Sequence, residues 1–504
     1  MVDQRVTIEV LPDDILLSIF TFYRLPNKIL CRPFFWRWHT LVQVSRRWRY
    51  VILALPHSLR PYLVTTYRSH WLSRWMSLGR WPPFPISIQY YNLGRTLAPE
   101  EEDDLASVLD QPDCIYEVCL TMSRSILEKS TAWVEGPFPE LERLSLKSNE
   151  PGLDLPSGFL GASVNSPLRL HHIHLSHISF PELPQFLRSC HDLVSVVLGP
   201  DLHVGVSFPS PEILTSALSA TTQLKRLTLR PDGYRDNYRP EKGSERSAPM
   251  DLICLPSLME FDFRGCRRYL EDFVSRIDAP HLERLRVSFH REHVVDIPQL
   301  SGFVSRAEQL RSMPYQTLFE MWRNGFSIRQ TFKHPSSHVT NDESNWVQIG
   351  CYGDLWNIPQ LLHISAQLSP LASTVERLQV KAWDLPPTIP KGGMDPAPWV
   401  QLFKHFDRVQ ELDLYSNAAP GTGIARGLEQ SAGDPKAPEL FPALRTLRLV
   451  DFDQDANLDS FIASRQHMVL SSHFSPWRSA IGGDLDLSGL ASLEDAESDL
   501  DMLF

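Results

Sequence analysis

The sequence predicts an α+β chain, in which a short N-terminal all-α module precedes an irregular α/β solenoid. Two observations predict this fold. Residues 8–55 place apolar side chains at helical spacing, and from about residue 112 a short strand pattern recurs almost to the end. The composition agrees, because 42% hydrophobic and 22% charged residues are typical of a folded protein rather than a disordered one.

The N-terminal module begins at Leu11 and Pro12. Proline suits the first turn of a helix, and Asp13 and Asp14 follow where the helix dipole favours negative charge. The first helix then repeats apolar residues on one face, namely Ile15, Leu16, Ile19, Phe20 and Tyr23. A second helical run covers 38–44, and Ser45 can cap a third helix that carries Trp48, Val51 and Ile52.

The recurring strand pattern is an apolar residue, two variable residues, an apolar residue, one variable residue and another apolar residue. Its first positions are 23 to 35 residues apart, apart from one gap of 93. The ten occurrences are Ile115/Val118/Leu120, Leu141/Leu144/Leu146, Leu170/Ile173/Leu175, Leu193/Val196/Leu198, Leu224/Leu227/Leu229, Leu258/Phe261/Phe263, Leu282/Leu285/Val287, Val375/Leu378/Val380, Val409/Leu412/Leu414 and Leu444/Leu447/Leu449.

This pattern predicts a stack of strand–helix units. The last two apolar residues of each unit share one face of a strand, and segments such as 181–190 and 211–220 form short amphipathic helices between strands. One such unit cannot bury its own core, whereas stacked units can, as in leucine-rich repeats. The alternative is an ordinary α/β domain. The 93-residue gap has room for two or three degenerate units, with strands expected at 315–319, 327–332 and 346–351.

These patterns divide the chain into four parts. We expect the helical module at 8–60, a connecting segment at 61–111 and the repeat array at 112–466. The acidic residues 467–504 lose the repeat pattern and are expected to be mostly disordered.

The N-terminal residues resemble an F-box. That pattern is Leu-Pro-x-acidic, an aliphatic helix, an interruption, and an aliphatic run that ends in Val-Ser-x-x-Trp-Arg. The matching residues here are Leu11, Pro12, Asp14, Ile15, Leu16, Ile19 and Phe20, then Leu41, Val44, Ser45, Arg47, Trp48 and Arg49. The chain up to about residue 466 is also similar to the F-box-like proteins expanded in mushroom-forming (basidiomycete) fungi. It departs from the pattern by a long insertion at 24–38.

The resemblance implies a part in ubiquitination, in which F-box proteins dock a Skp-family adaptor and through it a cullin. The residues expected to contact the adaptor are Leu11, Pro12, Ile15, Leu16, Ile19, Leu41, Val44 and Trp48. The alternative is that the module caps the repeat array, and some of these residues are expected to serve its own core.

The variable strand positions predict a basic outer face. They hold ten basic residues (Arg143, Lys147, Arg226, Arg230, Arg264, Arg284, Arg286, Arg377, Lys381 and Arg448) and five acidic ones (Glu117, Glu260, Asp262, Glu411 and Asp413). Such a face suits an acidic or phosphorylated segment of a target protein. The residues expected to bind the target are Arg226, Arg230, Arg284, Arg286, Arg377 and Lys381. The alternative is that exposed strand positions simply tolerate any solvated residue.

Other classes of function find little support in the sequence. A net charge of −11 argues against general nucleic-acid binding. The seven cysteines form no C-x-x-C pair, His172 and His174 lack nearby acidic or cysteine ligands, and Cys351 is expected to be a buried strand residue. Residues 421–427 (GTGIARG) are expected to form a flexible turn. We expect no signal peptide, membrane helix, cofactor or metal, and a cytoplasmic or nuclear location.

The sequence therefore predicts a non-enzymatic adaptor, the substrate-recognition subunit of a Skp–cullin–F-box type ubiquitin ligase. The alternative is a leucine-rich repeat scaffold for protein–protein interaction outside ubiquitination.

Overall fold

The computed structural model describes most of the chain between residues 11 and 473. The described ranges are 11–24, 44–53, 63–65, 85–91, 97–132, 134, 137–150, 152–156, 158–161, 169–199, 208–231, 252–290, 296–322, 325–332, 345–352, 358–368, 374–382, 396–416, 420–433, 439–450, 458–465 and 468–473. The chain divides into unit 1, residues 1–315 with 324–371, and unit 2, residues 316–323 with 372–504.

Unit 1 holds two N-terminal helices and a long, mostly parallel sheet. The helices are α1 (Asp13–Arg24) and α3 (Arg46–Leu53). The main strands, in the order in which they lie in the sheet, are β1 (Leu63–Thr65), β2 (Ile86–Tyr91), β3 (Ile115–Met122), β4 (Arg143–Ser148), β6 (His172–Ser176), β8 (Ser195–Leu198), β9 (Arg226–Leu229), β11 (Glu260–Gly265), β13 (Arg284–His290), β16 (Asn345–Tyr352) and β15 (Gly325–Phe332).

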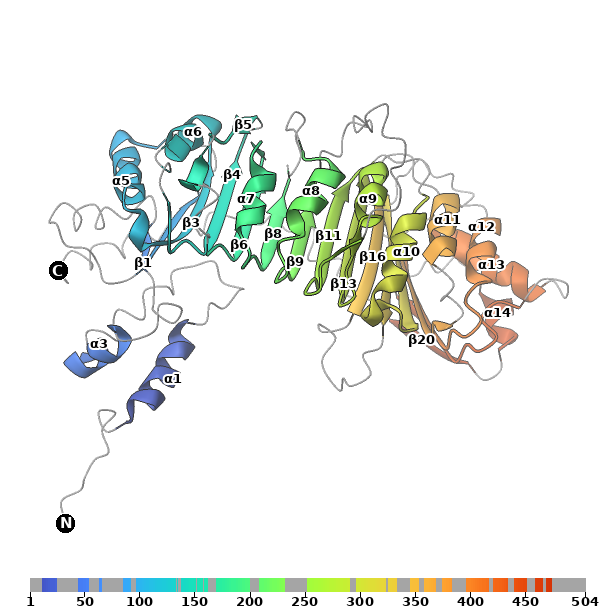
Figure 1. The fold of residues 1–504 in the computed structure, drawn as a ribbon. Coiled ribbons are helices and arrows are strands. Elements are labelled where there is room, and N and C mark those ends of the chain that lie inside the picture. The colour runs from blue at the N-terminus through green and yellow to red at the C-terminus, as the bar shows by residue number, and fades with distance from the viewer. Residues whose placement is uncertain are drawn as a thin grey trace, which may run out of the picture. The chain divides into compact units, whose positions relative to one another are not determined.

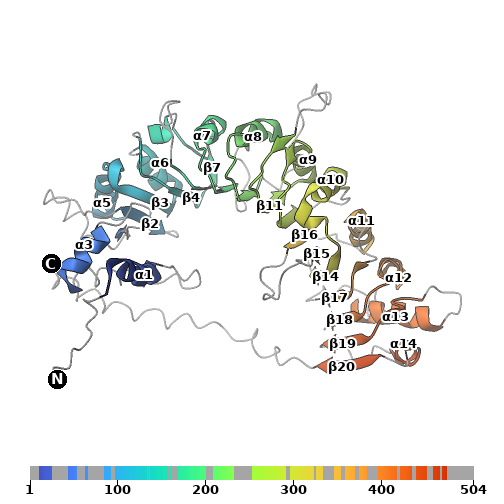
Figure 2. The ribbon, with the colours of Figure 1, turned by 60° about the horizontal axis from the view of Figure 1, so that its bottom comes forward.

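Short helices connect the strands of unit 1 and lie together on one face of its sheet (Figures 1 and 2). They are α5 (Pro99–Leu109), α6 (Arg124–Ala132), α7 (Leu183–Ser189), α8 (Pro211–Leu218), α9 (Arg267–Val274), α10 (Pro298–Arg306) and α11 (Ile358–Leu368), with 3-10 turns η4 (Pro112–Cys114), η5 (Phe159–Gly161) and η6 (Glu308–Leu310). Two small parallel pairs accompany them, β5 (Leu153–Asp154) with β7 (Ile178–Ser179) and β10 (Ile253–Cys254) with β12 (Ile277–Asp278).

Unit 2 repeats the same arrangement with a parallel sheet. Its strands lie in the order β14 (Pro314–Trp322), β17 (Arg377–Ala382), β18 (Glu411–Ser416), β19 (Thr446–Val450) and β20 (Val469–His473). Its helices, α12 (Ala397–Phe403), α13 (Pro420–Gly433) and α14 (Asp459–Ala463), again lie on one face of the sheet (Figure 2).

The predicted apolar pattern forms the core. Its second positions lie in register from strand to strand, as Leu144 faces Ile173 and Leu227 faces Phe261. The first position of every predicted unit is buried, and Leu141 is fully so. Burying a leucine contributes about 2 kcal/mol, so three such residues per unit hold the helices against the sheet. The expected mixture of helices with a long parallel sheet is confirmed, and so are the predicted helices at 181–190 and 211–220.

The long gap in the pattern is filled only in part by strand–helix units, because α11 follows β16 but no described helix separates β14, β15 and β16. Its three expected strands form, as β14, β15 and β16, but β15 runs antiparallel to β16. Parallel neighbours need a crossover, usually a helix. The linker at 333–344 (KHPSSHVTNDES) has no helical apolar spacing, so the chain reverses instead.

Two expected boundaries and one expected turn need correction. The sheet begins before residue 112, because β2 in the expected connecting segment pairs with β3. It also continues past residue 466, because β20 pairs with β19 inside the expected disordered tail. Residues 421–427 belong to helix α13 rather than to a turn, since Ile424, Ala425 and Leu428 are buried.

Candidate interaction surfaces

The helices α1 and α3 share a small apolar core. Leu16 and Phe20 of α1 pack on Trp48 and Val51 of α3, and all four side chains are buried. The rings of Phe20 and Trp48 meet edge to face with centroids 5.1 Å apart. The helical spacing of these apolar residues therefore produces a pair of helices that packs on itself.

Polar contacts fix the same pair of helices. Arg47 donates from Nε to Asp13 Oδ1 at 3.1 Å and from Nη2 to the Leu11 carbonyl at 2.6 Å. Ser45 caps α3 as expected, because its Oγ accepts from the backbone N–H of Trp48 at 3.2 Å. Arg47 thereby holds the start of α3 against the start of α1.

Several large apolar side chains remain outside this core. Ile15, Val44 and Tyr50 are 43%, 55% and 73% exposed, and they make up three of the nine exposed large apolar side chains among the described residues. Sequence reasoning missed Tyr50. The helical spacing could have found it, since Trp48 and Val51 point inward and leave Tyr50 on another face of α3.

The residues expected to contact an adaptor therefore separate into groups. Ile15, Val44 and Pro12 are exposed, while Leu11 and Ile19 are half-buried beside the core. Leu16 and Trp48 are buried in the core of the pair itself, so their side chains stabilise the helices rather than present a surface. Leu41 lies outside the described residues.

The open strand face of unit 1, defined as the face of its sheet opposite the connecting helices, carries the variable strand positions. Several of its charges pair across neighbouring strands. Arg284 donates to Glu260 at 2.9 Å, and Glu260 lies opposite both Arg284 and Arg226 in the strand register. Glu117 is nearly buried, accepts from Ser87 Oγ at 2.6 Å and lies 3.9 Å from Arg143.

Four arginines lie close together on this open face, and two of them have no ion pair among the described residues. We call Arg226, Arg230, Arg264 and Arg286, on or beside β9, β11 and β13, the arginine cluster. Arg226 and Arg286 are exposed, and in the described part of the chain neither forms an ion pair with an acid within 4.0 Å. The arginine cluster is thus the most basic part of this face.

Asp262 is the acid among these arginines. Burial raises the pKa of its carboxyl above the usual range, and the positive charges of Arg286, Arg230 and Arg264 oppose that shift in pKa. The carboxyl group of Asp262 therefore lies near three guanidinium groups, those of Arg286, Arg230 and Arg264.

Two side chains hold members of the arginine cluster in place. The guanidinium of Arg286 lies over the ring of Trp346, 5.3 Å from its centroid. Arg264 donates from Nε to Nε2 of His290 at 2.7 Å, so this ring nitrogen is the unprotonated acceptor. Neither contact cancels a positive charge.

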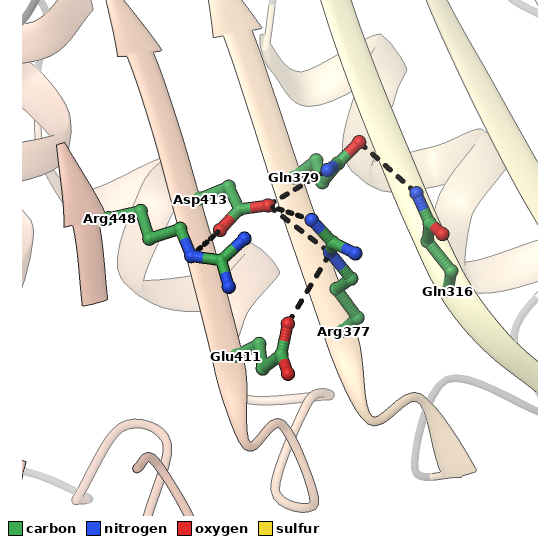
Figure 3. A network of polar contacts seen from close by, with 6 residues as sticks. All are labelled: Gln316, Arg377, Gln379, Glu411, Asp413 and Arg448. Atoms are coloured by element: carbon green, nitrogen blue, oxygen red, sulfur yellow. Dashed lines mark hydrogen bonds and ion pairs between the residues drawn. The ribbon is translucent and has the colours of Figure 1, made fainter. Parts of the chain in front are cut away.

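Unit 2 carries a different kind of charge arrangement (Figure 3). Asp413 is fully buried, and its Oδ2 accepts from Arg377 Nη2 at 2.8 Å and from Gln379 Nε2 at 2.8 Å. Gln379 in turn accepts from Gln316 at 3.1 Å. Arg448 approaches Asp413 Oδ1 at 3.9 Å, and Glu411 lies 3.6 Å from Arg377.

The remaining cation on this face of unit 2 is also paired. Lys381 lies 3.7 Å from Glu320, its neighbour in the strand register, and its Nζ is 5.6 Å from the centre of the Tyr415 ring. Sequence reasoning missed Glu320 because this residue lies in the gap between recognised units. The expected basic face is therefore charge-balanced at Arg377 and Lys381, and at Arg284 of unit 1. Among the described residues it persists at Arg226 and Arg286.

The described residues offer no metal site and no membrane span. They contain no group of three or more histidine, cysteine or acidic side chains placed to hold a metal ion. His174 contacts Ser145 Oγ at 3.4 Å, and Cys351 is a buried strand residue, as predicted. Within the same part of the chain, no helix has the length and apolar character that crossing a membrane requires.

Comparisons with known proteins give distant likenesses among solved structures alone. No protein-family model matches the chain. No curated protein is significantly similar to it. Among solved structures, the leucine-rich repeat-containing protein LegL7 from Legionella pneumophila is similar at 13% identity and a TM-score of 0.28, over 70% of this chain and 88% of that chain. We base neither fold nor function on a likeness of this size.

Proposed function

We propose that this chain is a non-enzymatic adaptor, the substrate-recognition subunit of a Skp–cullin–F-box type ubiquitin ligase. The pair α1/α3 docks a Skp-family adaptor, and an open strand face binds the protein to be modified. In this function the chain needs neither a cofactor nor a metal, because the chemistry belongs to its partners.

The observation that carries the proposal is the distribution of apolar side chains on α1, on α3 and at Val44, two residues before α3. Four buried residues make the pair's own core, yet Ile15, Val44 and Tyr50 stay largely in water. Exposed apolar and aromatic side chains gathered on a small element are typical anchors for a partner's groove. This distribution agrees with the resemblance of the same residues to an F-box.

The open strand faces support the second half of the proposal. Parallel strands in register present side chains at regular spacing, and the connecting helices of each unit lie on the other face of its sheet (Figures 1 and 2). Repeat proteins use such continuous surfaces to bind other proteins.

The alternative is an interaction scaffold outside ubiquitination, with α1/α3 as a structural module. One observation favours it. Leu16 and Trp48, two of the expected adaptor contacts, are buried in the core of the pair. The two helices therefore bury part of their apolar surface without a partner.

The test is reconstitution of the full chain with a purified Skp-family adaptor and a cullin, followed by size-exclusion chromatography. The key variant is Ile15→Asp. Its matched control is Ile213→Asp, because Ile213 is also the third residue of a helix and is similarly exposed, at 49%. We expect a ternary complex with wild type and with the control, and none with Ile15→Asp. A complex with the Skp-family adaptor that excludes the cullin, or no complex with folded wild type, would favour the scaffold.

A further inference from the structure

We infer that the arginine cluster of unit 1 binds a phosphorylated segment of the target protein, with Arg226 and Arg286 as its principal contacts to the phosphate. This inference rests on the proposed function, since it names the chemistry that the target must present to the adaptor.

The strand register places the arginine cluster in one small area. β11 lies between β9 and β13, so Arg226 and Arg286 are two strands apart and two register positions apart. With neighbouring strands about 4.8 Å apart and about 3.3 Å of rise per residue, their Cα atoms lie about 12 Å from one another. The flexible side chains of both arginines can therefore reach a single group placed above Asp262.

The charges in this area do not cancel. Glu260 is paired with Arg284, which leaves Arg226 without an ion pair among the described residues although it faces the same carboxylate in the register. Asp262 lies opposite Arg286 in the strand register, and the exposed guanidinium groups of Arg226 and Arg286 keep their positive charges unmatched among the described residues. In unit 2, by contrast, Arg377, Arg448 and Lys381 are matched by Asp413, Glu411 and Glu320.

A phosphate group fits this excess better than a carboxylate does. A phosphorylated side chain carries between −1.5 and −2 charges and three acceptor oxygens, whereas glutamate carries one charge and two oxygens. All four residues of the cluster are arginines, whose planar fork of N–H groups matches phosphate geometry. A nucleic acid fits less well, because the chain's net charge is −11 and Glu260 interrupts the basic positions.

The arginine cluster is also partly ordered before any ligand arrives. Trp346 supports the guanidinium of Arg286, and His290 orients Arg264 through Nε. Next to Arg230, Gly199 has a φ of +139°, and a Cβ atom there would collide with the Arg230 backbone. Side chains that are already placed lose less conformational entropy on binding.

The experiment measures fluorescence anisotropy of the full chain with labelled peptide mixtures. The probe is a nine-residue mixture with phosphoserine fixed at the centre and all other positions degenerate. Matched mixtures carry serine or glutamate at the centre, and a 12-nucleotide single-stranded RNA serves as the nucleic-acid probe. We expect the phosphoserine mixture to bind wild type at least about tenfold more tightly than the other three probes, the effect of one to two good phosphate contacts.

The variants identify the site. Arg226→Gln/Arg286→Gln should lose at least about tenfold in affinity for the phosphoserine mixture. Arg286→Lys should lose less, because it keeps the charge but not the fork. The matched control is Arg188→Gln/Arg268→Gln, which removes two arginines from α7 and α9 on the helix-covered side of the sheet. Thermal unfolding of each variant checks that it is folded.

Each contrary result has a definite meaning. If folded wild type does not prefer the phosphoserine mixture, or if the control pair loses as much affinity as the cluster pair, the inference is overturned. Tighter binding of the glutamate mixture or of the RNA would overturn it in favour of those ligands. Binding of the Skp-family adaptor, measured on the same variants, is a separate readout. If wild type does not bind the Skp-family adaptor, the proposed function is contradicted, whereas the phosphoserine result stands by itself.

Discussion

Arg377 donates from both Nε and Nη2 to a single oxygen of Asp413, Oδ2, at 3.2 and 2.8 Å. Asp413 is fully buried although its strand position belongs to the open face of unit 2. A buried carboxylate requires such donors, because burial of an unpaired charge is strongly unfavourable. Arg377 therefore stabilises the fold of unit 2, and the guanidinium is engaged before any target binds.

The first prediction concerns this ion pair. Asp413→Ala should lower the free energy of unfolding of unit 2 by about 2–3 kcal/mol, somewhat less than for a fully buried pair because Arg377 is one-third exposed. Glu411→Ala is the control, since Glu411 is 41% exposed and its loss should cost under about 1 kcal/mol. Urea unfolding followed by tryptophan fluorescence, to which buried Trp399 of unit 2 contributes, measures both. Equal effects of the two substitutions would contradict the structural role of Asp413.

The second prediction concerns pH. Burial, followed by the positive charges of Arg143 and Arg226, lowers the pKa of His172 to about 4. Above pH 6.5 this histidine is neutral in both the folded and the unfolded chain. As the pH falls from 6.5 toward 4, the unfolded chain takes up a proton that the folded chain does not, so stability decreases.

Histidine-selective NMR of the full chain tests this pH dependence, with His172→Gln used to assign the signal. Arg143→Gln should raise the pKa of His172, whereas the control Arg268→Gln, on α9, should leave it unchanged. A His172 signal that titrates near pH 6.5 in wild type would show that the predicted burial and charge effects are absent.

The third prediction concerns cysteine reactivity. Burial raises the pKa of the Cys190 thiol to about 12, and burial with the neighbouring Glu117 does the same for Cys119. The thiolate is the reactive form, so at pH 8 iodoacetamide should modify exposed Cys254 well before either of these residues. Peptide mass spectrometry after brief labelling measures the order. Labelling of Cys190 at the rate of Cys254 in the folded protein would be inconsistent with this packing.

The fourth prediction concerns Gly199. A Cβ at this position would meet the backbone of Arg230 at less than van der Waals contact, and the φ of +139° is one that other residues rarely adopt. Gly199→Ala should therefore destabilise the protein by at least about 1 kcal/mol and weaken phosphoserine-peptide binding by moving Arg230. Gly158→Ala is the comparison, because its φ is +81° but no atom lies within 4 Å of the added Cβ. A destabilisation at Gly199 no larger than at Gly158 would contradict the predicted clash with Arg230.

The core of both sheets could be predicted from the sequence. The apolar triplets, such as Leu141, Leu144 and Leu146, follow from the period of two in a strand and from the need to cover one face. The three strands inside the 93-residue gap, where no such triplet was recognised, were also predicted. The antiparallel direction of β15 could not be predicted, because strand pattern alone carries no direction.

The candidate surfaces were predictable only in part. Counting charges at variable positions indicated a basic face, but the count cannot show which charges meet. Lys381 pairs with Glu320 because β14 and β17 are neighbours although about 60 residues of sequence separate them. Similarly, helical spacing gave the apolar face of α1, but only the packing of Phe20 on Trp48 separates the buried residues from exposed Ile15.

We propose that α1 and α3 form a docking surface for a Skp-family adaptor. Isothermal titration calorimetry of the full chain with the purified adaptor tests it most directly, using wild type, Ile15→Asp/Val44→Asp and the control Ile213→Asp. We predict saturable binding by wild type and by the control, and at least about a tenfold weaker affinity for the double variant. Equal affinity of the double variant, or no heat of binding from folded wild type at any temperature between 10 and 35 °C, would contradict the claim.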